Sequence, residues 1–183
     1  EMEAEGVACA IKHFPGHGRS TTDSHLSAGE VIADSETLWK MDIAPFRELI
    51  AGGIPAVMPA HLVFTALDPG APALFSSRII SDLLRDRLGF RGLVISDCVE
   101  MSAVGDKYSP ERIAFEGISA GVDLFISSFS LKKSYDFQCA LKQAVDDVIR
   151  NTPSPSYGKS VDRLQGFVDT YPGIPAEDLN IDI

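Results

Sequence analysis

The sequence has few cysteines, no long apolar run and no excess of positive charge. Its three cysteines, Cys9, Cys98 and Cys139, are too few and too far apart for a disulfide framework or a zinc site, which favours a reducing compartment. No run of about 18 apolar residues occurs and no signal-peptide pattern opens the chain, so we expect a cytoplasmic protein that does not span a membrane. The net charge of -10 argues against nucleic acid as a partner, because phosphate binding needs a basic surface.

What the sequence does contain is an alternation of short apolar runs and longer amphipathic segments. The apolar runs are continuous, which predicts strands buried on both faces. They cover residues 7–11, 54–58, 93–95 and 122–126. Helices are expected over residues 45–51, 76–88, 109–120 and 134–150, the third opening with Ser109 as N-cap and Pro110 at the first helical position. The repeated order of strand, loop and helix predicts an α/β fold with a parallel sheet.

The composition changes after Arg150. The stretch NTPSPSYGK has the proline, serine and glycine content of a linker, residues 161–169 are compatible with a short helix, and the last residues form a polar tail. We therefore expect one folded domain over residues 1–150, followed by a linker and C-terminal tail over residues 151–183.

The loops that leave the predicted strands are long and polar, whereas those that enter them are brief. In parallel α/β folds, ligands bind at the carboxyl ends of the strands, where the leaving loops lie. The first of these loops begins with KHFPGHGRSTTDSH, residues 12–25, and holds three of the four histidines of the chain. The sequence therefore predicts a functional site at this edge of the sheet.

Two long motifs resemble those of a known enzyme family. KHFPGHG followed by TTDSH, and later MPAHLVFTALDPGAPALFSSRIISDLLRDRLGFRGLVISDCVEM, are similar to the signatures of the β-N-acetylhexosaminidases of glycoside hydrolase family 3. AGVDLFISS resembles the last barrel strand of that family, so the resemblance covers roughly residues 5–130. It implies a (β/α)8 TIM barrel that hydrolyses terminal β-linked N-acetylglucosamine with retention of configuration, and residues 1–150 then form part of the catalytic domain.

The resemblance assigns the catalytic groups. Asp97 in VISDC matches the family's nucleophile, and its place at the end of an apolar strand suits a rigidly held carboxylate. From spacing alone, a cap of the following helix is an equal alternative. His25 matches the general acid/base, with Asp23 as its orienting partner. A histidine titrates near pH 6.5 and a carboxylate on one ring nitrogen fixes its tautomer, so the pair suits proton transfer near neutrality.

The resemblance also implies that Lys12 and His13 bind sugar hydroxyls, with a salt bridge to a neighbouring strand as the alternative for this pair. His61 follows the second predicted strand and is a candidate to line the sugar site, although bracing of its loop is an equal interpretation. Met101 is a candidate to pack on the sugar, and packing in the hydrophobic core is an equal interpretation of this residue. No metal ion and no organic cofactor are implied.

Two positions depart from the family pattern. Arg19 stands where the family usually has an acidic residue after KHFPGHG, and Cys98 stands where a second acidic residue usually follows the nucleophile. Both departures bear on loop structure and substrate fit. Nothing near Cys98 resembles a cysteine–histidine pair, so the sequence does not favour Cys98 itself as a nucleophile.

A barrel of this class needs eight βα units and about 250 residues, whereas four units are present. The expected fold is therefore the C-terminal half of a (β/α)8 TIM barrel. Its partner is the missing N-terminal half, from the same gene or from another chain, or a second copy of itself that covers the open sheet edges. Two alternatives to hydrolysis remain open: an N-acetylglucosaminide phosphorylase, because a histidine acid/base tolerates an anionic acceptor, and an inactive half-barrel that serves as a binding or assembly module.

Overall fold

The structure is a computed structural model that describes residues 2–20, 29–128, 131–152 and 155–173. Its centre is a parallel sheet in the order β1-β3-β6-β7. The strands are β1 (Ala10–Phe14), β3 (Ala56–Pro59), β6 (Leu93–Cys98) and β7 (Leu124–Ile126). Each predicted apolar run lies at or beside one of these strands, and all three strand pairings are parallel. The predicted α/β fold with four βα units is confirmed.

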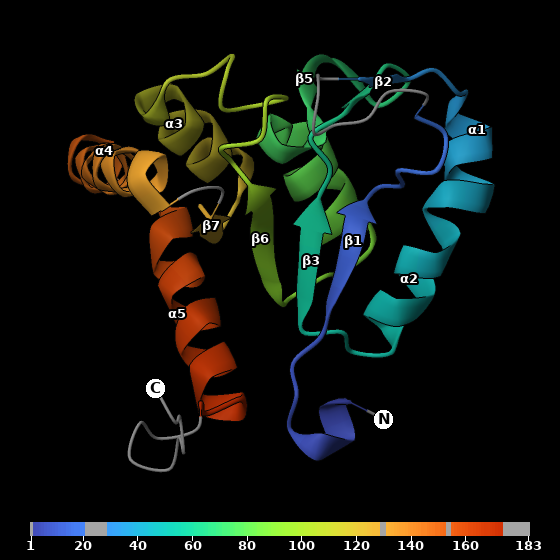
Figure 1. Cartoon of the computed structure of the whole chain (residues 1–183). Helices are drawn as coiled ribbons and strands as arrows, with labels where there is room; N and C mark the ends of the chain where they lie inside the picture. Colours follow the sequence, from blue (N-terminus) through green and yellow to red (C-terminus); the bar gives the residue numbers. More distant parts are fainter. Residues whose placement is uncertain (1, 21–28, 129–130, 153–154, 174–183) are drawn as a thin grey trace.

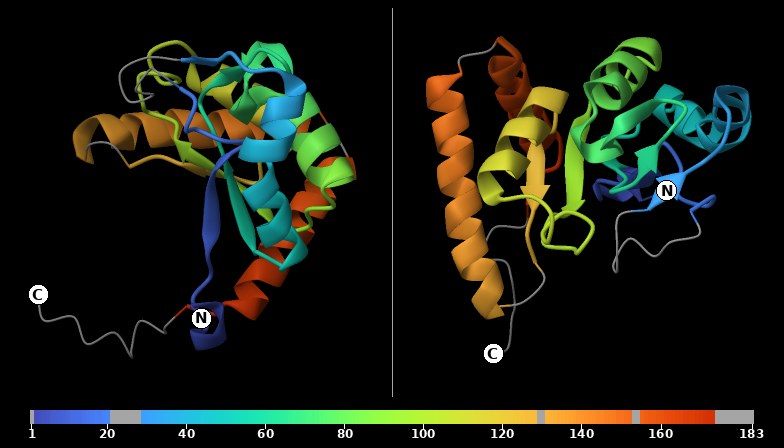
Figure 2. Two further views of the ribbon diagram at one scale, coloured as in Figure 1. Left: turned by 90° about the vertical axis from the view of Figure 1, so that its right-hand side faces the viewer. Right: turned by 90° about the horizontal axis from the view of Figure 1, so that it is seen from above.

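The helices pack on one side of this sheet. They are α2 (Ala44–Ala51), η4 (Arg78–Arg87), α3 (Pro110–Ala120) and α4 (Leu131–Asn151), preceded by α1 (Ser35–Thr37) and η2 (Leu38–Asp42). Seen from above, they form an arc behind the strands, and no described helix covers the opposite face (Figure 1, Figure 2). This arrangement, with two unpaired outer strands, is that of an open half-barrel. Short turns η1 (Glu3–Glu5) and η3 (Ala73–Phe75) complete the helical segments.

The helix boundaries follow local signals in the sequence. Ser109 caps α3 as predicted, because its side chain accepts a hydrogen bond from the backbone N–H of Arg112 at 3.4 Å. Gly121 ends α3 in the left-handed conformation with φ 110°. Helix η4 turns its apolar stripe to the core, so that Ile79 and Ile80 are fully buried.

A small second sheet lies at the carboxyl ends of the main strands, which the sequence did not predict. It contains β2 (Glu30–Val31), β4 (Val63–Phe64) and β5 (Asp68–Pro72) in the order β2-β4-β5. Its strands are formed by the loops that leave β1 and β3, and they lie above the main sheet (Figure 1). Because Val31 and Phe64 are fully buried, these loops are held by their own apolar side chains.

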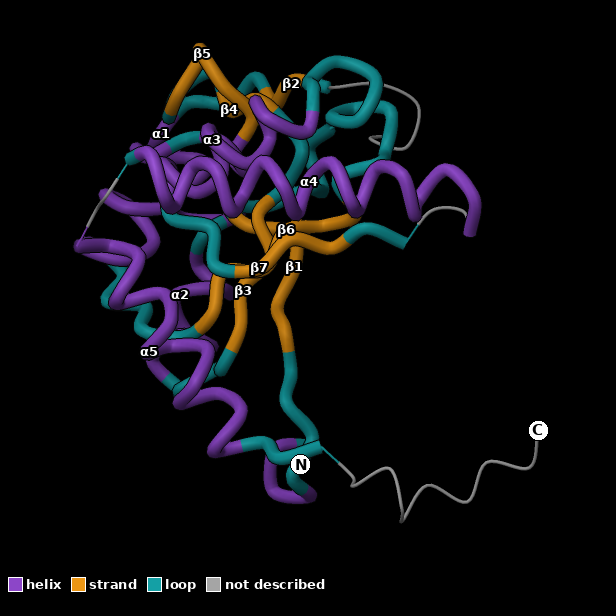
Figure 3. Tube along the Cα trace, turned by 90° about the vertical axis from the view of Figure 1, so that its left-hand side faces the viewer, coloured by secondary structure: helices purple, strands orange, loops and turns teal. Residues whose placement is uncertain are grey.

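The last described helix, α5 (Pro155–Thr170), is longer than the short helix expected over residues 161–169 and includes much of the predicted linker. It runs beside the sheet below α4 (Figure 3). The proline, serine and glycine content of NTPSPSYGK predicted a linker there, but serine and glycine are tolerated in a helix that tertiary contacts stabilise. Whether a domain boundary falls at residue 150 stays a prediction.

Asp123, at the start of β7, anchors α5 to the sheet. The side chain of Asp123 is fully buried and accepts hydrogen bonds from Arg85 Nη2 at 2.7 Å, Arg163 Nη2 at 2.6 Å and Ser160 Oγ at 2.5 Å. The backbone N–H of Val94 donates to the same carboxylate at 2.9 Å. Four structural elements therefore meet at one buried charge that is fully hydrogen-bonded, as a buried carboxylate must be to remain ionised.

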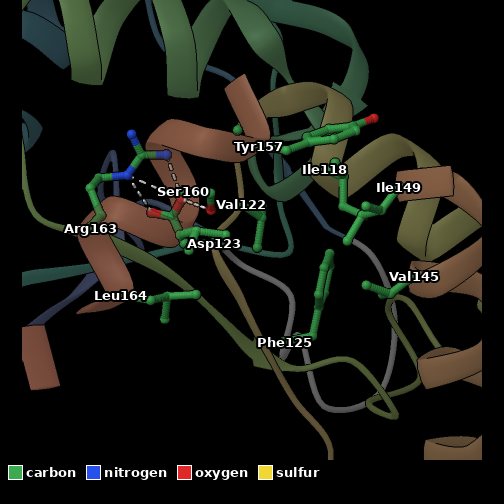
Figure 4. A pocket seen from close by; sticks show the side chains of 12 residues that line it. Ile118, Val122, Asp123, Phe125, Val145, Ile149, Tyr157, Ser160, Arg163 and Leu164 are labelled. Atoms are coloured by element: carbon green, nitrogen blue, oxygen red, sulfur yellow. Dashed lines mark hydrogen bonds and ion pairs between the residues drawn. The ribbon is translucent and has the colours of Figure 1, made fainter. Parts of the chain in front are cut away.

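An apolar pocket of about 270 Å³ adjoins this cluster, between β7, α4 and α5 (Figure 4). Phe125 and Ile149 belong to its walls, and Asp123 and Arg163 close one end. The pocket lies at the start of β7. It is therefore separate from the carboxyl edge of the sheet, where Asp97 ends β6.

Replacing Asp123 tests this anchor. Asp123→Ala leaves two guanidinium groups without their buried partner, so we expect the free energy of unfolding to fall by about 3–5 kcal/mol in urea denaturation followed by circular dichroism. The matched control is Asp146→Ala, which removes an exposed pair with Lys142 on α4 and is expected to leave the urea midpoint unchanged. Equal midpoint shifts for the two variants would contradict an anchoring role.

Candidate active site

Three side chains from neighbouring strands meet at the carboxyl edge of the sheet. His13 lies in β1, Asp97 lies in β6, and His61 follows β3, which pairs with β1 on one side and with β6 on the other. His13 Nε2 donates a hydrogen bond to Asp97 Oδ2 at 3.1 Å, and this contact therefore bridges the end of β3. His13 and Asp97 thus meet at the carboxyl edge, where the sequence predicts a functional site.

The Asp97 carboxylate is held by a donor on each oxygen. His13 donates to Oδ2, and the backbone N–H of Cys98 donates to Oδ1 at 2.7 Å. The hydrogen bond from His13 is the largest cause that holds the pKa of Asp97 well below its usual range; partial burial opposes the shift without cancelling it. Asp97 is thus ionised at neutral pH, so it can act as a nucleophile but cannot supply a proton.

His61 is buried behind this pair. Its side chain is 3% exposed, and neither ring nitrogen has a hydrogen-bond partner among the described residues. Burial lowers its pKa to about 4, which the negative charge of Asp97 only partly offsets and the neighbouring His13 reinforces. His61 is therefore a neutral imidazole near pH 7. Its ring nitrogens are enclosed, so a direct contact with a sugar stays a prediction that the free structure does not display.

Lys12 and Met101 differ sharply in exposure. Lys12 is exposed and forms no ion pair with any residue in the described ranges, whereas His13 pairs with Asp97 of β6. The salt bridge considered as the alternative for this pair is therefore formed by His13 and not by Lys12. Met101 is 4% exposed and its backbone shapes the turn after β6, so its side chain belongs to the core. A contact between Met101 and a sugar stays a prediction.

The loop after β1 is held by two contacts that precede its undescribed part. The rings of His13 and His17 lie 5.3 Å apart between centroids, so the loop packs back on the end of β1. Arg19 Nε donates to Asp42 Oδ2 at 2.7 Å, so the arginine that departs from the family pattern is paired with a carboxylate of η2. Asp23 and His25, the predicted acid/base pair, lie outside the described residues.

Sequence reasoning missed two features of the loop after β6. Cys98 contributes through its backbone N–H rather than through its thiol. Glu100 accepts a hydrogen bond from Ser127 Oγ, and Gln138 Nε2 donates to the carbonyl of Ser127 at 2.9 Å, so the loops after β6 and β7 are joined to α4. The only sequence signal for the second feature is an acidic residue close behind Asp97, which is too common to interpret without a structure.

The described residues contain no group of three histidine, cysteine or acidic side chains arranged to hold a metal ion. In the same part of the chain, no helix has both the length and the apolar character needed to cross a membrane.

Residues 1–165 match the model described as the glycosyl hydrolase family 3 N terminal domain. The chain belongs to glycosyl hydrolase family 3. The predicted family is thus confirmed, and the four-stranded parallel sheet is part of the family's barrel-like N-terminal domain.

Curated relatives of this glycosyl hydrolase family 3 chain are named beta-hexosaminidase. The protein of Tolumonas auensis is 41% identical over 129 residues, which are 69% of this chain and 38% of that protein. The protein of Alkalilimnicola ehrlichii is 35% identical over 154 residues, 84% of this chain and 41% of that protein. A solved family 3 beta-N-acetylglucosaminidase from Paenibacillus sp. matches with a TM-score of 0.86 and 35% identity, over 98% of this chain and 35% of that one. The chain therefore spans well under half the length of these relatives.

The buried His61 gives the folded chain a characteristic pH dependence. Between pH 6.5 and pH 4 the unfolded histidine binds a proton that the folded one does not, so the free energy of unfolding should fall by about 3 kcal/mol as the pH is lowered through this range. The stabilisation from Asp97, whose folded pKa is depressed, is lost only below its unfolded value of 3.8.

Urea denaturation at a series of pH values measures this loss. His61→Phe keeps a buried ring but removes the titrating group, so the decline between pH 6.5 and pH 4 should become much shallower in the variant. A wild-type midpoint that stays constant over this range, or an equal decline in both proteins, would show that His61 takes up its proton as readily in the folded chain as in the unfolded one.

Proposed function

We propose that this chain carries the nucleophile and sugar-binding residues of a retaining β-N-acetylglucosaminidase that removes terminal β-linked N-acetylglucosamine from muropeptides or related glycans. The observation that carries the proposal is the ionised Asp97 carboxylate, fixed by His13 and the Cys98 amide at the carboxyl edge of a parallel sheet. Ligand sites of such sheets lie at this edge. The names of the relatives supply the substrate class.

The chemistry follows in two balanced steps. An oxygen of Asp97 attacks the anomeric carbon and forms a glycosyl ester, while the bond to the leaving oxygen breaks and that oxygen takes a proton from His25. In the second step His25, now neutral, removes a proton from a water molecule that attacks the same carbon and releases Asp97. Asp23 supports the imidazolium form of His25 by a charged hydrogen bond. An ionised Asp97 suits this division of roles, because the proton must come from another group.

Lys12 and His13 are the proposed sugar-binding residues. The exposed ammonium of Lys12 has no described carboxylate partner, so all three of its donors are available to sugar hydroxyls. His13 uses Nε2–H on Asp97, which leaves Nδ1 as an acceptor for a hydroxyl group. One histidine can then hold the nucleophile and the sugar together, which fixes the distance between the reacting atoms.

The remaining half of the pocket is proposed to come from outside this chain. The relatives are more than twice as long as their matched regions, and the sheet has four strands with unpaired outer edges at β1 and β7. Four further βα units, in the same polypeptide or in a partner chain, would close the barrel. They would also cover Leu124 of β7, which is 42% exposed although it lies in a strand.

Covalent trapping tests the nucleophile. The completed enzyme is incubated with a 2-acetamido-2-deoxy-5-fluoro glycosyl fluoride, and the adduct is located by peptide mass spectrometry. We expect one sugar on Asp97, because the ester forms with this reagent but hydrolyses slowly. The Asp97→Asn variant should form no adduct. Labelling of another carboxylate would refute the assignment.

Product analysis separates hydrolysis from phosphorolysis. With an aryl N-acetyl-β-glucosaminide as substrate, we expect free N-acetylglucosamine both with and without inorganic phosphate. Accumulation of N-acetylglucosamine 1-phosphate when phosphate is present would identify a phosphorylase instead. If the completed enzyme turned over no substrate under either condition, the remaining hypothesis would be an inactive half-barrel that serves as a binding or assembly module.

The isolated 183-residue chain should show little or no turnover of the same substrate. Catalysis requires the sugar to be held within a fraction of an ångström, and half of the pocket is not contributed by this chain. Its open strand edges should also favour self-association, which size-exclusion chromatography detects. Addition of a separately produced N-terminal half should raise the activity. A monomer that turns over substrate at the rate of the completed enzyme would contradict the half-site argument.

A further inference from the structure

His61 has an unmet hydrogen-bonding requirement at the centre of the site. Its imidazole is 3% exposed, and neither ring nitrogen has a partner among the described residues. Native proteins rarely leave a buried polar group unpaired, because such a group has lost its hydrogen bonds to water without replacement. An unpaired imidazole at a functional edge therefore indicates a partner that is engaged only in the working state.

The position of His61 limits the choice of that partner. The residue continues β3, directly between the strand that carries His13 and the strand that carries Asp97. Both of these side chains interact electrostatically with the His61 imidazole. The ring nitrogens are enclosed by protein, and the strand adjacent to β3 carries the Asp97 carboxylate.

Asp97 has acceptor capacity left. Its two oxygens offer about four lone-pair positions, of which one on each oxygen is used, by His13 Nε2–H and by the Cys98 amide. His61 is neutral and therefore carries one N–H donor. A donated hydrogen bond from a neutral imidazole would restrain the carboxylate without adding a positive charge that would weaken its attack on carbon.

We propose that His61 is a positioning residue for the nucleophile, which donates a hydrogen bond to the Asp97 carboxylate when substrate fills the site and so holds that carboxylate in its attacking orientation. The inference rests on the proposed function, because it assumes that Asp97 attacks the sugar. It separates His61 from residues that touch the sugar itself and from residues that only fill the core.

Two substitutions distinguish these roles in the completed enzyme. His61→Phe keeps a planar ring and removes both nitrogens, whereas His61→Gln keeps an N–H donor on a shorter side chain. With an activated aryl glycoside, we expect His61→Phe to lower kcat by about 10- to 100-fold and to leave KM within about threefold, since a misdirected nucleophile slows reaction rather than binding. His61→Gln should recover most of the lost kcat. Ile113→Val, a buried substitution in α3, is the control for destabilisation alone and should retain wild-type kcat.

A nuclear magnetic resonance measurement on the completed enzyme with bound N-acetylglucosamine gives a second readout that needs no turnover. In protein labelled with ¹⁵N-histidine, Asp97→Asn should shift the His61 ring nitrogens, because the coupled carboxylate has lost its charge, while Ile113→Val should not. If His61→Phe does not fold, His61→Met takes its place as a variant without an N–H donor.

The outcomes are distinct. A raised KM with unchanged kcat would place His61 on the sugar and overturn the inference. Wild-type kcat in both His61 variants, or ring-nitrogen signals that do not respond to Asp97→Asn, would reduce His61 to core packing and overturn it as well. A completed wild-type enzyme without glycosidase activity would refute the proposed function instead, and would do so before any His61 variant is compared.

Discussion

The hydrogen bond from His13 to Asp97 across the end of β3 is the contact on which the site depends. It forms because β1 and β6 flank the same central strand in parallel, so that their last residues reach the same edge. The contact lowers the pKa of Asp97, fixes one of its oxygens and leaves the other to the Cys98 amide. His61 is buried next to this pair, and its burial keeps its imidazole uncharged near pH 7.

The rest of the half-barrel supports this edge from one side. Helices η4 and α3 bury their apolar stripes against the convex face, and the small sheet β2-β4-β5 holds the loops above it. At the other end of the strands, the Asp123 carboxylate accepts hydrogen bonds from Arg85, Arg163 and Ser160. Because Arg163 and Ser160 belong to α5, these bonds hold α5 against the start of β7. The His13–Asp97 pair and the Asp123 anchor thus lie at opposite ends of the sheet.

The two departures from the family pattern, Arg19 and Cys98, leave the contacts of Asp97 in place. Arg19 replaces a usual acid, but Asp42 of η2 supplies the opposite charge, so the loop after β1 still begins from a fixed point. Cys98 replaces another acid, yet its essential contribution to Asp97 is a backbone N–H that every residue except proline possesses. The Cys98 side chain is therefore free to vary while the Asp97 geometry is kept, whereas Arg19 contributes through its own side chain.

The sequence by itself determined the strand and helix order, the Ser109 cap, the parallel sheet and the membership in glycosyl hydrolase family 3. These follow from local patterns: apolar runs, helical periodicity, capping residues and two long motifs. It also predicted a functional site at the carboxyl edge of the sheet, where His13 and Asp97 meet, because the carboxyl ends of parallel strands coincide. The tertiary structure alone decided that His13 bonds Asp97, that His61 and Met101 are buried rather than exposed, that Asp123 anchors α5, and that a linker-like stretch is helical. These properties depend on which side chains distant in sequence become neighbours, and the resulting burial and hydrogen bonding are not encoded in any short segment of the chain.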